Sequence, residues 1–360
     1  MNIEELTIQE KIGQMFMIGL EENFSDKTIE MIKKYKIGGI ILYKKNYSSY
    51  EQMLKIVNTI KDSNVINKVP MFISIDQEGG RVNRMPADIK NIKSAKAIAD
   101  TKDIKLVKES GRILGEMLNS TGINMNYAPV LDIKRFEENH PIGNRCYGEK
   151  KEDVIKYGIE VMKEIQKQKV ISVIKHFPGH GTTKKDSHFR IPKISANIKE
   201  VEKEDIIPFK EAISQDADAI MIGHLVIKDI DKKYPASISK KVIQKYLKDF
   251  KGLIITDDLK MFAIRLHYNL KRAVVKAIEA GNDIVMVGVS YDEIKQILKY
   301  VCKQVEKGKL NVDRINQSVE KIIRMKEKYE ISNKNAKGFD IKEINARIEN
   351  INISTEKIIM

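Results

Sequence analysis

Short apolar runs alternate with amphipathic stretches along most of the chain. Eight of these runs are apolar almost throughout and rich in β-branched residues, as expected of strands that are buried on both faces. They occupy residues 14–20, 37–43, 71–76, 123–130, 171–177, 219–224, 253–258 and 283–288. The stretches between them have helical periodicity, and several begin at Ser or Asp, which cap free N–H groups at a helix start. The pattern predicts eight strands, each followed by a helix.

Strict strand–helix alternation is typical of an α/β protein, and eight repeats favour a single (β/α)8 TIM-like barrel. A doubly wound open sheet is the alternative, although no Gly-x-Gly-x-x-Gly turn follows the first strand, which weakens a dinucleotide-binding version. Residues 311–330 predict an additional helix after the eighth repeat. We expect residues 1–330 to form one barrel domain and residues 331–360 a polar C-terminal tail, helical and packed on the barrel.

Composition and charge narrow the classes of partner. The 360 residues are 42% hydrophobic and 32% charged, with a formal net charge of +14. The positive charge is mostly Lys, spread along helices and interleaved with Glu, which indicates solvated helix faces. Without a dense basic block or an aromatic-studded basic strand, we expect no nucleic-acid partner, whereas an acidic substrate remains compatible with the charge.

The chain shows no sign of a membrane segment or a disulfide framework. Its longest apolar runs are too short to cross a bilayer, and residues 1–16 lack the basic region and apolar core of a secretory signal. The two cysteines, Cys146 and Cys302, are distant in sequence and fit neither a disulfide network nor a zinc pattern. We therefore expect a cytoplasmic protein with no membrane partner.

Unusual polar residues gather where the predicted strands end. Functional groups of such barrels lie at the C-terminal ends of the strands and in the loops that follow them. These positions hold Asp76, Glu78, Arg81 and Arg84 after strand 3, Asp132 and Arg145 after strand 4, Lys175, His176, His180, Asp186 and His188 at or after strand 5, His224 at strand 6, and Asp257 and Asp258 at strand 7. Randomly scattered surface charge would not follow the strand ends, so this placement predicts an active site.

The carboxylates at the seventh strand have two interpretations. Asp257 or Asp258 could attack a carbon centre or stabilise a cation in a partly dry pocket, or it could cap the next helix. Because side chains alternate along a strand, only one of the two should face the pocket.

The segment after strand 5 offers an acid/base pair. Asp186 precedes His188 by two residues, so in an extended segment both side chains point the same way. A neighbouring carboxylate fixes the imidazole tautomer and raises its pKa, which suits proton transfer to a leaving group and later from water. An Asp–His pair that merely closes the loop is the alternative. Lys175 and His176, at the end of the strand, would grip hydroxyls or anions together with Arg84 and Arg145.

Two other hypotheses remain open on the residues alone. His176, His180, His188 and His224 could form the centre of a metal-dependent barrel hydrolase, although the first strand offers no ligand and loop histidines are poorly positioned for one. The barrel could also bind sugars without catalysis. We expect no cofactor and no metal.

Several motifs resemble those of glycoside hydrolase family 3, in its β-N-acetylhexosaminidase branch. The segments "DQEGGRVNR", "NYAPVLD", "IGNRCYG", "KHFPGHG", "DSH" and "ITDDLKM" occur in the order and spacing of that branch, and the resemblance covers roughly residues 5 to 330. "KHFPGHG" followed closely by "DSH" is its most specific feature. The resemblance implies a barrel enzyme that releases terminal β-linked N-acetylglucosamine (GlcNAc).

The resemblance also implies a role for individual residues. Asp257 matches the nucleophile that forms a covalent glycosyl intermediate, His188 the general acid/base, and Asp186 its partner. Positions that hold the sugar ring are matched by Asp76, Arg84, Arg145, Lys175 and His176. The implied reaction is retaining and exo-acting, on peptidoglycan or muropeptide fragments of the GlcNAc–MurNAc or GlcNAc–anhydroMurNAc type. Some relatives transfer the sugar to phosphate instead of water, so a phosphorylase remains the alternative.

Overall fold

Eight parallel strands form a nearly closed barrel at the centre of the protein. The computed structural model describes residues 3–22, 24–135, 142–180, 194 and 197–359. The strands are β1 Phe16–Gly19, β2 Gly39–Leu42, β3 Phe72–Ile75, β4 Met125–Asn126, β5 Ile171–Phe177, β6 Ala219–Ile222, β7 Leu253–Thr256 and β8 Val285–Val287. Each lies inside one of the eight predicted runs, and every strand residue is buried. The (β/α)8 prediction is therefore confirmed, and the open-sheet alternative is wrong.

Strand pairing follows chain order around the barrel. The hydrogen-bonded order is β7-β6-β5-β4-β3-β2-β1-β8, and all pairs are parallel. Ile18 of β1 pairs with Ile40 of β2 on one side and with Val287 of β8 on the other. A parallel bridge between Ile255 and Ile284 brings β7 beside β8. This closure points the C-terminal ends of all eight strands toward one face, which is where barrel active sites lie.

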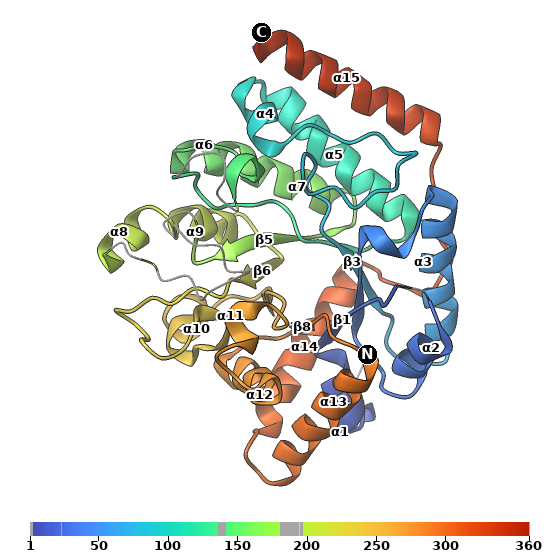
Figure 1. The fold of residues 1–360 in the computed structure, drawn as a ribbon, viewed down its shortest axis with the longest axis vertical. Helices are drawn as coiled ribbons and strands as arrows, with labels where there is room; N and C mark the ends of the chain where they lie inside the picture. The colour runs from blue at the N-terminus through green and yellow to red at the C-terminus, as the bar shows by residue number, and fades with distance from the viewer. Residues whose placement is uncertain (1–2, 23, 136–141, 181–193, 195–196, 360) are drawn as a thin grey trace.

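Helices surround the barrel (Figure 1). They are α1 Ile8–Gln14, α2 Asp26–Lys33, α3 Tyr50–Asn64, α4 Ala95–Asp100, α5 Ile104–Thr121, α6 Lys151–Asp153, α7 Ile159–Lys167, α8 Ile198–Lys203, α9 Ile207–Ser214, α10 Lys240–Leu247, α11 Phe262–Arg265, α12 Leu270–Ala280, α13 Tyr291–Glu306, α14 Val312–Lys328 and α15 Ile341–Ile359. As predicted, Ser and Asp cap several of them: Ser49, Asp103, Ser239 and Ser290 each accept a backbone N–H of the first turn. Among the described residues, no helix is long and apolar enough to span a bilayer.

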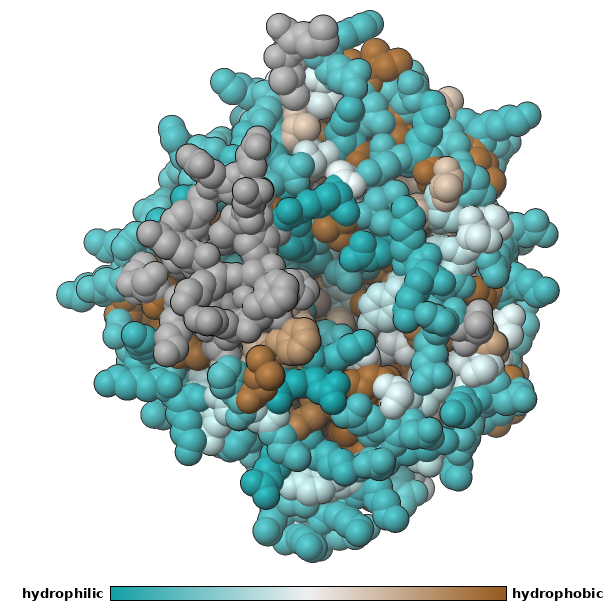
Figure 2. All heavy atoms as spheres, in the orientation of Figure 1, coloured by the Kyte–Doolittle hydropathy of each residue, from teal (hydrophilic) through white to brown (hydrophobic). Residues whose placement is uncertain are grey.

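The segment after α14 returns to the first half of the barrel. Phe339 packs against Tyr50 of α3 with ring centroids 4.2 Å apart. Further along, α15 lies beside α4 and α5 (Figure 1), burying Ile344, Ile348 and Ile351. The face shown in Figure 2 is mainly hydrophilic with scattered apolar side chains, as the spread of Lys and Glu along the sequence suggests.

Candidate active site

A cavity of about 320 Å³ lies at the C-terminal ends of the strands. Its walls come from seven of the eight strands, β2 to β8, or from the loops that follow them. They are formed by Ile41, Tyr43, Asp76, Val82, Arg84, Ile142, Arg145, Lys175, His176, His180, Met221, Asp257, Asp258, Met261 and Met286. The cavity thus joins charged groups that are far apart in sequence, and three methionines, Met221, Met261 and Met286, line it with apolar surface.

A charge network centred on Lys175 forms one wall. The Lys175 side chain is 2% exposed, and its Nζ lies 2.8 Å from Asp76 Oδ1 and 2.6 Å from Glu78 Oε1. Arg145, in the 3₁₀ turn Gly143–Arg145, donates two hydrogen bonds to Glu78, at 2.8 Å from Nε and 2.7 Å from Nη2. Burial would raise the pKa of Glu78, but Lys175 and Arg145 outweigh burial and hold that pKa far below its usual range.

His176 is held in place by a buried carboxylate. Asp132, which follows β4 and is fully buried, lies with Oδ2 2.7 Å from Nδ1 of His176. The other oxygen accepts the backbone N–H of His180 at 2.6 Å. Burial works against the ionised form of Asp132, but the neighbouring His176 and the hydrogen bonds prevail and lower its pKa. Asp132 therefore fixes the imidazole of His176 and the start of the loop after β5.

Asp257 follows β7 and faces the cavity. Its Oδ1 accepts the backbone N–H of Asp258 at 2.8 Å. Burial tends to raise the pKa of Asp257, yet the nearby His224 and His176 rings and that N–H lower the pKa overall. His224 is itself fixed, with Nδ1 2.7 Å from Ser237 Oγ and Nε2 3.0 Å from the carbonyl of Asp258. Asp257 is thus held as an ionised carboxylate against a partly apolar cavity.

Asp258 is used structurally. Its Oδ1 accepts the backbone N–H groups of Lys260 at 2.9 Å and of Gly288 at 3.0 Å. Burial raises the pKa of Asp258 despite these bonds. The carboxylate thereby ties the turn after β7 to the end of β8. Both acids line the cavity, so the expectation that only one of them faces it is wrong, and the role of Asp257 as the reactive acid stays a prediction.

Of the residues predicted for the site, six lie together in this cavity. They are Asp76, Arg84, Arg145, Lys175, His176 and Asp257. Asp186 and His188, the predicted acid/base pair, lie outside the described residues, so their roles stay predictions. Prediction from sequence noted Glu78, Asp132 and His224 at strand ends but gave them no part in supporting the residues of this cavity, and it missed Tyr43. The signal was available for the first three, since each is a polar residue just beyond a buried strand.

The metal hypothesis finds no support in the described part of the chain. No group of three or more His, Cys, Asp or Glu side chains that could hold a metal ion occurs among those residues. His176 and His224 are instead engaged by Asp132 and Ser237. The fourth histidine of that hypothesis, His188, lies outside the described residues.

Comparison with known families agrees with this geometry. Residues 7–325 match the model of the glycosyl hydrolase family 3 N-terminal domain. The chain is 30% identical over 327 residues to "Beta-hexosaminidase A" of Pseudoalteromonas piscicida, which covers 83% of this chain and 54% of that protein. It is 29% identical over 303 residues to "Beta-hexosaminidase" of Nitrosomonas eutropha, which covers 81% of this chain and 86% of that protein. The chain therefore spans about half of the first relative and most of the second.

A solved structure shares both fold and sequence with the chain. A glycoside hydrolase family 3 β-N-acetylglucosaminidase from Paenibacillus sp. FPU-7 superposes with a TM-score of 0.90 at 32% identity. The match covers 97% of this chain and 69% of that protein. The similarity thus extends over the whole barrel and includes the region of α15.

Proposed function

The chain belongs to glycosyl hydrolase family 3, and we propose that it is a retaining exo-β-N-acetylglucosaminidase. The observation that carries the proposal is the position of Asp257: an ionised carboxylate at a barrel strand end, facing a cavity with a network of Lys175, Asp76, Glu78 and Arg145. Relatives named beta-hexosaminidase support the same activity.

In the proposed reaction, Asp257 is the nucleophile. A carboxylate oxygen attacks the anomeric carbon while the bond from that carbon to the leaving oxygen breaks, which leaves a covalent glycosyl ester. His188 gives its proton to the leaving oxygen, and Asp186 stabilises the imidazolium form beforehand. In the second step His188 takes a proton from water as the water oxygen displaces the Asp257 carboxylate. The lowered pKa of Asp257 supports this role, because attack requires the ionised form.

The network opposite Asp257 would position the sugar. Lys175 and Asp76 offer a donor and an acceptor at 2.8 Å from each other, a spacing that suits vicinal hydroxyl groups of a pyranose ring. Arg84 and Arg145 add donors, and His176 is oriented by Asp132. Binding in a fixed geometry lowers the barrier because translational and rotational freedom has already been lost. We propose terminal GlcNAc of peptidoglycan fragments, of GlcNAc–MurNAc or GlcNAc–anhydroMurNAc type, as the natural substrate.

A panel of aryl β-glycosides tests the activity. We expect the β-GlcNAc glycoside to be cleaved far faster than the β-glucoside and β-galactoside, with release of β-GlcNAc by NMR and no GlcNAc 1-phosphate in phosphate buffer. Asp257→Asn should lower kcat by on the order of a thousandfold or more. Asp249→Asn, at an exposed position just before β7, is the matched control and should retain wild-type rates. Full activity of Asp257→Asn would refute the proposed nucleophile.

A leaving-group series tests His188. His188→Ala should reduce turnover of an alkyl β-GlcNAc, whose leaving oxygen needs a proton, by on the order of a hundredfold or more. Cleavage of a dinitrophenyl glycoside, whose leaving group needs none, should be much less affected in its first step. Equal losses on both substrates would contradict the acid role.

A further inference from the structure

A buried ion pair lies beside the turn that follows β5. Asp205 lies between α8 and α9, and its side chain is fully buried. Arg135, in the segment after β4, donates a hydrogen bond from Nη2 to Asp205 Oδ2 at 3.1 Å. The same segment contains Asp132, which orients His176. The ion pair therefore joins the connection between two outer helices to a segment that supports the active site.

Asp205 also contacts the turn directly. We call residues 179–180 the β5 turn. Gly179 has a φ of +117°, and a methyl group added there would lie 2.7 Å from Asp205 Cβ, so only glycine allows this close approach. The next residue, His180, lines the active-site cavity and donates its backbone N–H to Asp132 at 2.6 Å. The β5 turn is thus packed against Asp205 and bonded to Asp132.

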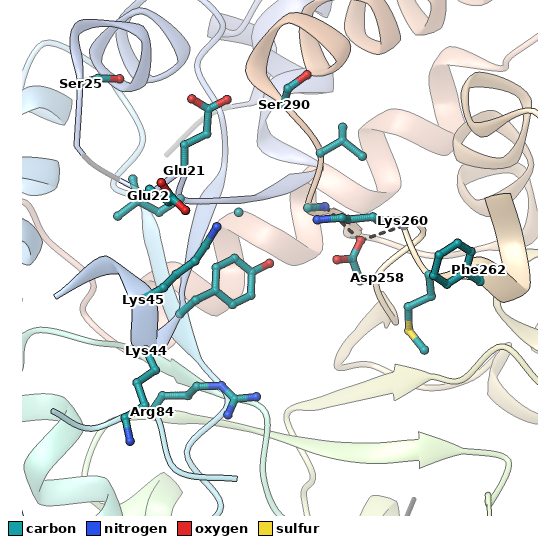
Figure 3. Close-up of a pocket in the computed structure, with 16 residues that line it drawn as sticks. Glu21, Glu22, Ser25, Lys44, Lys45, Arg84, Asp258, Lys260, Phe262 and Ser290 are labelled. Carbon is teal, nitrogen blue, oxygen red and sulfur yellow. Dashed lines mark hydrogen bonds between the residues drawn. The ribbon is translucent and has the colours of Figure 1, made fainter. Parts of the chain in front are cut away.

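Two buried atoms of the ion pair have no hydrogen-bond partner in the part of the chain that the structure describes. They are Oδ1 of Asp205 and Nε of Arg135. Asp258, a buried carboxylate with a structural use, differs because it accepts two backbone N–H groups, drawn as dashed lines in Figure 3. A buried polar atom without a partner costs free energy of folding. Two such atoms in one pair indicate a feature that is kept for function rather than for stability.

The charges around Asp205 oppose its ionised form. The acidic groups that face it are those of Asp132, Glu200 and Glu204, and the cation among the described residues is Arg135. Burial together with these acids outweighs Arg135 and raises the pKa of Asp205 to about 7. Arg135 is also shared, since its Nη1 lies 3.3 Å from the exposed Glu200. The ion pair is therefore lost when Asp205 gains a proton.

We propose that Asp205 is a positioning residue for the glycosidase reaction and that, paired with Arg135, it holds the β5 turn in the geometry that the active site needs. The inference rests on the proposed function, because the β5 turn affects catalysis only through the cavity that His180 lines. Asp205 is not among the residues that line this cavity. It acts through the β5 turn and through the segment after β4, and it does so while it is ionised.

The pH dependence of an isosteric variant tests the proposal. Asp205→Asn keeps the shape of the side chain but resembles the protonated acid, so it forms no ion pair at any pH. On an aryl β-GlcNAc, the ratio of wild-type to variant kcat/KM should rise from about one at about pH 5.5 to about ten at about pH 8. Ionisations that both enzymes share, such as those of Asp257 and His188, cancel in this ratio. A ratio that stays constant over this range would overturn the proposal.

Urea unfolding separates this role from a general contribution to stability. The folded pKa of Asp205, about 7, lies above the ordinary value of 3.8, so between these values the folded chain binds more protons than the unfolded chain. Wild-type stability therefore falls as the pH rises through this window, and Asp205→Asn lacks this loss. The urea midpoint of the variant should rise relative to that of wild type while its relative activity falls. A relative midpoint that falls together with activity would overturn the positioning role.

A double-mutant cycle tests whether the pair acts as a unit. At about pH 8, Asp205→Asn, Arg135→Met and the double variant should all have kcat/KM about tenfold below wild type, because each of them lacks the ion pair. Asp249→Asn, at an exposed position before β7, is the matched control and should keep the wild-type pH profile. Losses that multiply in the double variant would overturn the proposal.

Hydrogen exchange reports on the β5 turn independently of activity. The Gly179 amide donates to the His176 carbonyl at 2.8 Å, and the His180 amide donates to Asp132. At about pH 8, both amides should exchange about tenfold faster in Asp205→Asn than in wild type. Equal exchange rates would overturn the role of Asp205. Faster exchange in a protein whose wild type cleaves no β-GlcNAc glycoside would instead overturn the proposed function and leave the support of the β5 turn in place.

Discussion

Two buried lysines lie at opposite ends of the same barrel in opposite electrostatic settings. Lys175, at the C-terminal end of β5, and Lys326, near the end of α14, are each 2% exposed. Lys175 contacts two carboxylates, Asp76 and Glu78. Within the described residues Lys326 contacts no carboxylate: its Nζ donates to Gln14 Oε1 at 2.8 Å and to the Gly38 carbonyl at 3.1 Å.

The two lysines show that equal burial does not imply equal surroundings for the amine. The ammonium of Lys326 lies 4.4 Å from the centroid of the Phe72 ring, and burial lowers its pKa well below the usual range. That amine holds the base of the barrel together by hydrogen bonds. At the other end, the Lys175 amine lies between two carboxylates, those of Asp76 and Glu78, on the wall of the cavity. The contrast predicts that one lysine serves activity and the other packing.

The largest expected effect separates the two lysines by activity. Lys175→Met should lower kcat/KM on an aryl β-GlcNAc by on the order of a thousandfold, since the proposed preorganised donor to the sugar is lost. Lys326→Met should stay within about twofold of wild type, because its contacts lie at the far end of the barrel. Steady-state kinetics on both variants, with circular dichroism to verify folding, makes the comparison. Similar losses in the two variants would refute the assignment of Lys175 to activity and of Lys326 to packing.

The next largest effect is on the free energy of unfolding and comes from the charge network around Glu78. Glu78→Gln should lower the free energy of unfolding by about 3 kcal/mol, because Lys175 and Arg145 would lose a buried counter-charge. Glu349→Gln is the control, since Glu349 pairs with Lys90 at an exposed site and should contribute less than about 1 kcal/mol. Urea unfolding measures both. Equal changes would mean that the network around Glu78 is no more than a surface ion pair.

The smallest effect is a pH dependence of the free energy of unfolding that arises from Lys326. Unfolded Lys326 titrates near its ordinary pKa of 10.5, whereas the folded pKa is lower. Between the two values the unfolded chain binds more protons, so the free energy of unfolding rises with pH. Over this window the wild type should gain up to about 1.4 kcal/mol per pH unit relative to Lys326→Met. Parallel pH profiles for the two proteins would contradict a depressed pKa at Lys326.

Most of the fold follows from sequence, because the barrel strands are short, apolar and β-branched. The sequence did not reveal the elements whose hydrophobic periodicity is weak. The run at 123–130 yields a strand of only two residues, Met125 and Asn126, and the Asn126 side chain bonds both backbone groups of Gln77 beyond the end of β3. The helices α1, α4, α8 and α11 were also missed, because each is shorter than the pattern needed to recognise a helix.

The site was predictable to the extent that strand ends mark it. Individual candidates such as Lys175 and Asp257 stood out as polar residues after apolar strands. The contacts between these residues could not be predicted in this way. The hydrogen bond between Arg145 and Glu78, for example, joins loops that are 67 residues apart in sequence.

The helix α15 has a consequence for how the protein is made. Its Ile344, Ile348 and Ile351 cover α4 and α5, which are completed by Thr121. A ribosome adding roughly 5–20 residues per second needs on the order of tens of seconds to reach α15 after α5 has been synthesised. During that interval the nascent chain carries an uncovered apolar face. Docking of α15 therefore removes from the nascent chain an exposed apolar surface of the kind that makes incompletely folded chains prone to aggregate.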